Sequence, residues 1–185
     1  MLMGRAIVLV REEAGAAGAS LEELKAYLRI GGSGEDGLLE GLLKSATALC
    51  EQFIGQWLII SNARETVRAD GGWQRLSATP VVAIAGLEVV GPDGVAQALP
   101  ADAYGIDIDA AGDGWVRTRP MDDRRVLAVT YQAGWAADAD GLPDPIRQGI
   151  VRLAAEHFSA REGQVATPPA VVGALWRPWR RMRLA

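Results

Sequence analysis

Residue types that commonly catalyse reactions or bind metals are scarce in this sequence. His157 is the single histidine and Cys50 the single cysteine, so neither a Cys/His metal cluster, a catalytic histidine pair nor an internal disulfide can form. Asp107 and Asp109 partly match a calcium loop, but its closing acidic ligand would fall at Thr118. No nucleophile-elbow or Walker pattern occurs. We therefore predict that the chain is not an enzyme and needs no cofactor or metal.

A glycine-rich stretch offers the next chemical possibility. Residues 32–37 match the G-x-G-x-x-G pattern of dinucleotide-binding proteins, but a helix is predicted before them where that fingerprint needs a strand. Glu35 and Asp36 would place carboxylates where a pyrophosphate sits, whereas acidic residues suit the start of a helix without any ligand. The stretch is therefore interpreted as the beginning of a helix.

The most distinctive side chains lie at the end of the chain, in residues 168–185. This segment holds two tryptophans and four arginines and follows the last acidic residue, Glu162, so its net charge is +4. The remaining 15 basic residues stand against 23 acidic ones, which leaves a net charge of −8 elsewhere. Tryptophan and arginine commonly anchor protein interfaces. A disordered basic end and a docking arm that orders on a partner are the two interpretations of the segment.

Three helices are predicted around these residues. Ser20 and Glu23 form a capping box for a helix that should end at Gly31. Residues 35–55 form the strongest helix, which should end at Gly55. Its expected buried stripe, which includes the Cys50 thiol, consists of Leu38, Leu39, Leu42, Leu43, Ala46, Leu49, Cys50, Phe53 and Ile54. The last helix should begin with Asp144 as N-cap and run to about residue 161, with His157 packing in the core or against another subunit.

Strand patterns occupy the middle of the chain. Short alternating or β-branched runs bounded by Gly, Pro and Asp extend from residue 58 to residue 132, which is typical of antiparallel strands. We therefore predict an α+β protein, a helical bundle with an inserted small antiparallel β-rich subdomain and an extended C-terminal arm. The expected parts are an N-terminal extended arm (1–19), a helical core (20–57 and 137–163), a β-rich insert (58–136) and a C-terminal docking arm (164–185).

Two sequence stretches carry a resemblance to a known family. LPDPIRQGI (142–150) is similar to the Val/Leu-Pro-x-x-Ile start of the last helix in head–tail connector (adaptor) proteins of tailed bacteriophages and phage-derived gene transfer agents. ALWRPWRRMRL (174–184) is similar to their Leu-x-x-Pro-[Tyr/Trp]-Arg-Arg-x-Arg-Leu ending. Together with the order of helices and strands, the resemblance covers about residues 20–185.

The resemblance implies a structural role in the neck of a virion or gene transfer agent particle, assembled in the bacterial cytoplasm. It implies a ring, expected to be a dodecamer, that lies beneath the portal protein, extends the DNA channel and carries stopper or tail-side neck proteins. The acidic body suits a channel through which DNA passes without sequence-specific binding, because basic walls would hold phosphates. The start of the chain has no apolar run long enough for a signal or membrane span, so no membrane partner is expected.

The predicted portal-binding site is the C-terminal arm. Trp176 and Trp179 are expected to fill apolar pockets between portal subunits, and the complete set is Leu175, Trp176, Arg177, Trp179, Arg180, Arg181, Arg183 and Leu184. A chain ending at Thr167 is expected to stay folded. The alternatives are a nucleic-acid-binding protein or a membrane-surface protein that acts through the same Trp/Arg tail.

Overall fold

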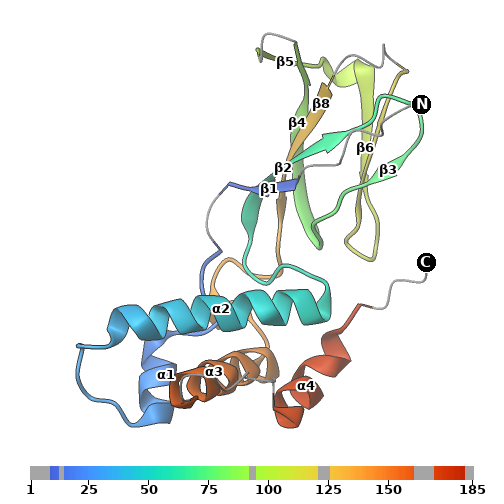
Figure 1. Cartoon of the computed structure of the whole chain (residues 1–185). Helices are drawn as coiled ribbons and strands as arrows, with labels where there is room; N and C mark the ends of the chain where they lie inside the picture. Colours follow the sequence, from blue (N-terminus) through green and yellow to red (C-terminus); the bar gives the residue numbers. More distant parts are fainter. Residues whose placement is uncertain (1–8, 13–14, 92–94, 121–125, 161–168, 182–185) are drawn as a thin grey trace, which may run out of the picture. The chain divides into compact units, whose positions relative to one another are not determined.

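A computed structural model describes residues 9–12, 15–91, 95–120, 126–160 and 169–181 (Figure 1). The chain divides into two compact units, a β unit (1–14 and 60–134) and a helical unit (15–59 and 135–185). Within the described residues, four α-helices and two antiparallel sheets confirm the α+β class. The chain leaves the helical unit after the second helix and returns to it before the third.

The first helix, α1 (Leu21–Leu28), begins with the predicted capping box. The Ser20 hydroxyl accepts from the Glu23 N–H (3.1 Å), and the Glu23 carboxylate accepts from the Ser20 N–H (2.8 Å). The predicted end at Gly31 is wrong, because Arg29 already adopts the left-handed conformation that closes the helix (φ 58°). The Ile30 N–H donates to the Lys25 carbonyl and the Ile30 side chain packs on the core, and this contact outweighs the preference for glycine.

The second helix, α2 (Asp36–Ile54), forms the central wall of the helical core. Its fully buried residues recur at three- and four-residue spacing and are Leu39, Leu43, Ala46, Thr47, Cys50 and Ile54. Gly55 caps it with a left-handed backbone (φ 72°), as predicted. The predicted buried stripe is too wide, because Leu38 and Leu49 are 56% and 37% exposed. The two residues are eleven positions apart and so lie on nearly the same side of α2, which the other described elements leave partly open.

The third helix, α3 (Asp144–Ser159), packs against α1 and α2. Its N-cap is Pro143, and Asp144 is the first helical residue, so the predicted N-cap is wrong by one position. Proline can hold the N-cap place here because its extended backbone (ψ 138°) precedes the helix, and its carbonyl accepts from the Ile146 and Arg147 N–H groups. Ile146, Ile150 and Leu153 are wholly buried, as the sequence pattern indicates.

The predicted N-terminal arm contains two different described segments. Residues 9–11 form β1 (Leu9–Arg11), an edge strand that pairs with β2 (Ser61–Val67). Residues 15–19 belong to the helical unit, where the Gly18 N–H donates to the Thr47 hydroxyl (2.9 Å) and Ala19 is buried. The description of 1–19 as one extended arm is therefore wrong for its described residues, because small residues let the chain enter the core at Gly18.

The β unit contains two antiparallel sheets. The larger has the strand order β1-β2-β8-β4-β5, where β4 is Val81–Val90, β5 is Ala96–Ala98 and β8 is Val126–Ala133. The smaller has the order β3-β7-β6, formed by β3 (Gln74–Arg75), β6 (Tyr104–Ile108) and β7 (Gly114–Thr118). The long central strand β8 pairs with β2 on one side and β4 on the other. The predicted antiparallel strands are therefore present.

A buried carboxylate ties the loop after β3 to the larger sheet. Glu65 on β2 is only 2% exposed, and its oxygens accept from the Ser77 N–H (2.9 Å), the Ser77 hydroxyl (2.6 Å) and the Tyr131 hydroxyl (2.7 Å). The Tyr131 oxygen in turn accepts from the Ala78 N–H (3.1 Å). Burial is the main cause that raises the pKa of Tyr131 well above its ordinary value. Every donor in this group is satisfied, which makes a buried charge tolerable.

Candidate functional site

The C-terminal segment is a folded part of the helical unit. Ala170–Trp176 form α4 and Arg177–Trp179 form a 3-10 turn, η3. Pro169 precedes the helix with an extended backbone, and Pro178 lies inside the 3-10 turn, so the α-helix does not continue through the arginines. The extended C-terminal arm is therefore wrong for residues 169–181. The apolar residues of α4 lie on one face of the helix, and this face packs against α2 and α3. The ribbon of α4 lies beside α3 in Figure 1.

Trp176 is the largest side chain on the face of α4 that packs against α2 and α3. Its side chain is 2% exposed, and its indole N–H donates to the Ile146 carbonyl on α3 (3.3 Å). Gly149 on α3 makes room for the ring, because a Cβ at that position would lie 2.1 Å from the Trp176 Nε1 atom. The Phe53 ring of α2 packs against it with centroids 5.9 Å apart. Trp176 is therefore a core residue in this conformation.

Trp179 is held near the C-terminal end of α2 by a ring contact and a hydrogen bond. Its ring meets the Trp135 ring edge-on at a centroid distance of 5.4 Å. Gln56 joins the two, since its amide N–H donates to the Trp179 carbonyl and its amide oxygen accepts from the Trp135 indole N–H, both at 3.1 Å. The Arg181 N–H donates to the Ile54 carbonyl (2.9 Å). The end of the described chain is thus hydrogen-bonded to the turn that closes α2.

The structure sorts the eight predicted portal-binding residues into three groups. Trp176 is buried and Leu175 packs partly on the same core. The exposed or partly exposed members are Arg177, Trp179, Arg180 and Arg181. Arg183 and Leu184 lie outside the described residues. The portal contact itself stays a prediction. The arginines that would make it follow α4, which is packed on the helical unit.

A groove runs between α2 and α4. It has a volume of about 570 Å³ and is lined by Leu49, Gln52, Phe53, Pro169, Ala170, Gly173, Trp176 and Arg177. The Arg180 guanidinium lies over the Phe53 ring, 5.7 Å from its centroid, so two positive charges stand near one end. Sequence reasoning did not predict this groove, because it arises only when α4 packs beside α2.

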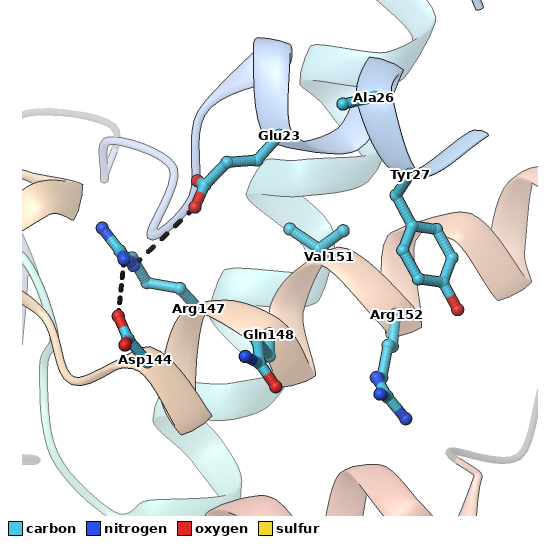
Figure 2. A pocket seen from close by; sticks show the side chains of 8 residues that line it. All are labelled: Glu23, Ala26, Tyr27, Asp144, Arg147, Gln148, Val151 and Arg152. Carbon is cyan, nitrogen blue, oxygen red and sulfur yellow. Dashed lines mark hydrogen bonds and ion pairs between the residues drawn. The ribbon is translucent and has the colours of Figure 1, made fainter. Parts of the chain in front are cut away.

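A second hollow of about 550 Å³ lies between α1 and α3, and its lining residues are shown in Figure 2. Arg147 holds this region together. Its guanidinium contacts Asp144 (2.6 Å) and Glu23 (3.8 Å), as Figure 2 shows, and also Asp140 (3.6 Å). These contacts join α1 to the start of α3, while the buried Arg147 Nε atom has no hydrogen-bond partner among the described residues.

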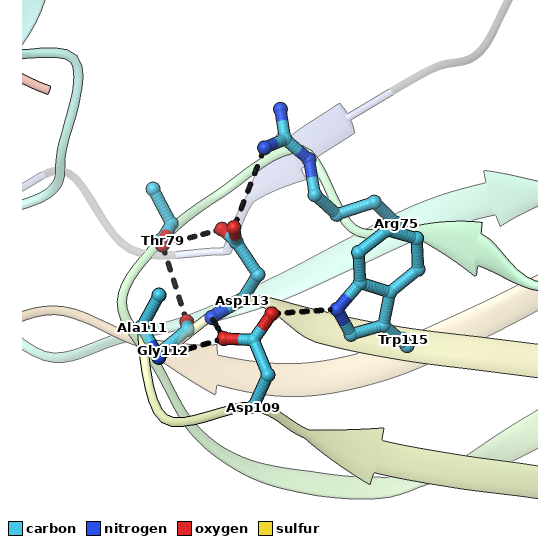
Figure 3. A network of polar contacts seen from close by, with 7 residues as sticks. All are labelled: Arg75, Thr79, Asp109, Ala111, Gly112, Asp113 and Trp115. Carbon is cyan, nitrogen blue, oxygen red and sulfur yellow. Dashed lines mark hydrogen bonds and ion pairs between the residues drawn. The ribbon is translucent and has the colours of Figure 1, made fainter. Parts of the chain in front are cut away.

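The aspartates of the weak calcium pattern organise a turn in the β unit (Figure 3). One Asp109 oxygen accepts from the Ala111 and Asp113 N–H groups (2.9 Å each), and the other accepts from the Trp115 indole N–H (3.0 Å). Asp113 is held by Arg75 (3.4 Å). These carboxylates thus bind donors of their own chain. In the described part of the chain, no group of three or more His, Cys, Asp or Glu side chains could hold a metal ion.

The single cysteine takes the buried place predicted for it, and the role predicted for the single histidine stays a prediction. Cys50 is fully buried on α2, and burial, with a smaller contribution from the charge of Glu51, raises the pKa of its thiol well above its ordinary value. His157 is half-buried on α3. Residues 29–35 connect α1 to α2, so a helix precedes the glycine pattern of residues 32–37. Among the helices described, none is long and apolar enough to cross a membrane.

Comparison with known proteins gives the remaining observations. Residues 18–87 match the family described as phage gp6-like head-tail connector protein. No curated protein matches the chain. Three solved structures match over 96% of this chain and 97% of theirs. They are the neck of an empty gene transfer agent particle computed with C6 symmetry (25% identity, TM-score 0.79), the neck of a native particle computed with C12 symmetry (26%, 0.76) and a native gene transfer agent virion (25%, 0.74).

These matches confirm the resemblance inferred from the sequence. The family match covers α1, α2, β2, β3 and most of β4, while the structural matches extend over nearly the whole chain. All of them are connector or particle proteins, which agrees with the prediction that the chain is not an enzyme.

Proposed function

We propose that this chain, which carries a gp6-like head–tail connector region and the fold of gene transfer agent neck proteins, is a structural connector in the neck of such a particle. The observation that carries the proposal is the match to a neck chain over 96% of this chain and 97% of that one, at 25% identity and a TM-score of 0.79. A match over so much of both chains involves the β unit and the C-terminal segment as well as the helices.

The connector would act as a ring beneath the portal protein, extend the DNA channel and carry the stopper or tail-side neck protein. Support for the ring comes from the C6 and C12 symmetry of the similar necks. Support for a channel that does not hold DNA comes from the net charge of −8 outside the last 18 residues, since a duplex moves freely past acidic walls. Twelve copies are the expected number.

The portal contact is proposed for the end of the chain, from Trp179 onward. Trp179 and Arg181 are fixed at the end of α2, and the exposed Arg180 places its guanidinium over the Phe53 ring. Arg183 and Leu184 continue this sequence and complete the proposed contact. Leu175 and Trp176 would serve it indirectly, because they hold α4 on the body and so set where the segment leaves it.

Deletion of the gene tests the function. The expected result is particles with filled heads that lack tails, and complementation with the wild-type gene should restore tailed particles. Normal yields of tailed, transducing or infectious particles without this protein would contradict the proposal.

A double variant, Trp179→Ala with Arg181→Ala, tests the portal contact separately. Interface anchors commonly cost about 2–4 kcal/mol each when truncated, and the loss repeats in every subunit, so the variant should fold but fail to remain on tailless heads. Arg68→Ala, which removes a positive charge from the β unit, serves as the matched control and should remain bound. Equal retention of the double variant and the control would contradict the portal contact and leave the connector function standing.

A further inference from the structure

Two leucines on one side of α2 are exposed in the part of the chain that the structure describes. Leu38 near its start is 56% exposed and Leu49 near its end is 37% exposed, although the helical pattern predicts burial for both. Eleven residues separate them, which is close to three turns of helix, so they lie on the same side of α2, about 16 Å apart. Single exposed leucines are ordinary on a protein surface, so the groups beside each leucine decide what it could bind.

The two ends of this face differ in charge. Glu35 lies three residues before Leu38, is exposed and makes no side-chain capping bond to α2. No basic side chain in the described part of the chain forms an ion pair with Glu35. The first end of α2 therefore presents a leucine beside an unpaired carboxylate.

The second end has the opposite character. Leu49, Phe53 and Gly173 line the groove between α2 and α4, and Arg177 stands at its rim. No carboxylate among the described residues pairs with Arg177, and the Arg180 guanidinium over the Phe53 ring adds a second positive charge. The groove, with a volume of about 570 Å³, is thus lined mainly by apolar side chains and has positive charges at its edge. This arrangement suits an apolar side chain accompanied by a carboxylate.

We infer that the groove between α2 and α4 receives the start of α2 from a second copy of this chain, with Leu38 entering the groove and Glu35 facing Arg177. The inference rests on the proposed ring and names the surfaces that would build it. A single chain cannot make this contact with itself, because the two surfaces lie at opposite ends of one rigid helix. The contact is heterologous, so each copy offers one surface to each of its two neighbours, and such contacts generate a closed ring when the rotation closes.

The charges favour a second copy over other occupants of the groove. The start of α2 supplies both required features, a protruding leucine and a carboxylate, on one side of one helix. Each contact alone is small and weak, so we expect the isolated chain to be a monomer at low concentration and to close into a ring when many contacts form together.

Cross-linking in assembled particles tests the inference. Leu38→Cys and Gly173→Cys are combined in one chain, since a side chain at Gly173 meets nothing within 4 Å and the native Cys50 is buried. A short bis-maleimide reagent should then produce a ladder of covalent multimers of this chain, whereas each single-cysteine variant should remain monomeric. A double variant that is present in the neck but stays monomeric, or that cross-links only to another neck protein, would overturn the inference while the connector function stands. Absence of the wild-type protein from particles would overturn both.

Charge reversal provides a second measurement. Arg177→Glu should lower the number of copies per particle by about tenfold or more, because repulsion repeats at every contact. Adding Glu35→Arg to the same chain should restore incorporation, and the matched reversal Arg68→Glu in the β unit should leave it unchanged. Loss of incorporation without rescue would show that Arg177 meets a different partner and would overturn the inference.

Discussion

The helical unit buries almost only apolar side chains, whereas the β unit buries charged and polar groups as well. Among the described residues, Thr47 is the one buried polar side chain of the helical unit, while the β unit buries Ser61, Glu65, Thr79, Asp113 and Thr118. The interior of the helical unit depends on close packing of side chains, as where the Trp176 ring fits against Gly149 and Phe53. The β interior depends largely on hydrogen bonds, because each unsatisfied buried group costs about 1–3 kcal/mol, and of these side chains the Thr118 hydroxyl has no hydrogen-bond partner among the described residues.

The difference implies that the two units fail under different substitutions. Loss of volume or added volume should damage the helical unit, and loss of a single polar atom should damage the β unit. The four predictions that follow compare these sensitivities, beginning with the largest expected effect.

Removal of the C-terminal segment should destabilise the helical unit most. A chain ending at Thr167 loses Val172 and Trp176, both buried, so the earlier expectation that it stays folded is reversed by the packing of α4. Removal of a buried tryptophan alone commonly costs about 3–5 kcal/mol. Urea unfolding followed by hydrogen exchange in α2 and α3 measures the loss. Val171→Ala is the control, because that side chain is 46% exposed, and an unchanged midpoint for the truncated chain would show that α4 is not part of the core.

An added methyl group at Gly149 should act through the same contact. The new Cβ would meet the Trp176 ring at 2.1 Å, and neither the ring nor α3 can yield without moving α4. Overpacking of this kind costs about 1–3 kcal/mol. Gly173→Ala is the matched control, since it fills open space and replaces a helical glycine, which should be neutral or slightly stabilising. Equal stability of the two variants would contradict the proposed fit of Trp176.

The β unit should respond to a change of one atom. Glu65→Gln keeps the shape of the side chain but replaces one accepting oxygen by an NH₂ group that cannot accept from Ser77 or Tyr131. We expect a loss of about 1–2 kcal/mol, seen as faster hydrogen exchange in β2 and β8 with little change in the helices. Gln132→Glu, an equally small change at an exposed site on β8, is the control. A similar response from both would show that the buried carboxylate is not required.

The smallest effect should appear at alkaline pH. Burial raises the pKa of the Cys50 thiol above its ordinary value of 9.0 and that of the Tyr131 hydroxyl above 10.0. Above these values the unfolded chain releases protons that the folded chain retains, so stability falls as pH rises, by about 1.4 kcal/mol per pH unit for each group. Cys50→Ala should remove the first part of this slope, from pH 9, and Tyr131→Phe the part that begins at pH 10. Slopes that neither substitution changes would contradict the assignment.

Several features were determined by the sequence alone, because they depend on residues that are neighbours along the chain. The Ser20–Glu23 capping box, the buried position of Cys50 on α2 and the Gly55 cap all involve contacts within a few residues or one helical face. The change from helical to strand periodicity and back likewise predicted the α+β class. The family resemblance came from two short sequence motifs, in residues 142–150 and 174–184.

Other features were decided only by the tertiary structure, because their partners are far away in the sequence. Periodicity predicted burial for Leu38 and Leu49 but could not show that the described elements leave both partly exposed. The sequence of the Trp/Arg segment was equally compatible with an arm and with a packed helix. Gly149 contacts Trp176 and Gln56 binds Trp179, but nothing in the sequence around Gly149 or Gln56 indicates these contacts. Glu65 gave no indication of burial, since its donors come from a loop and a distant strand. Local patterns determine which helices and strands form, whereas complementarity between distant surfaces determines which side chains remain free to meet a partner.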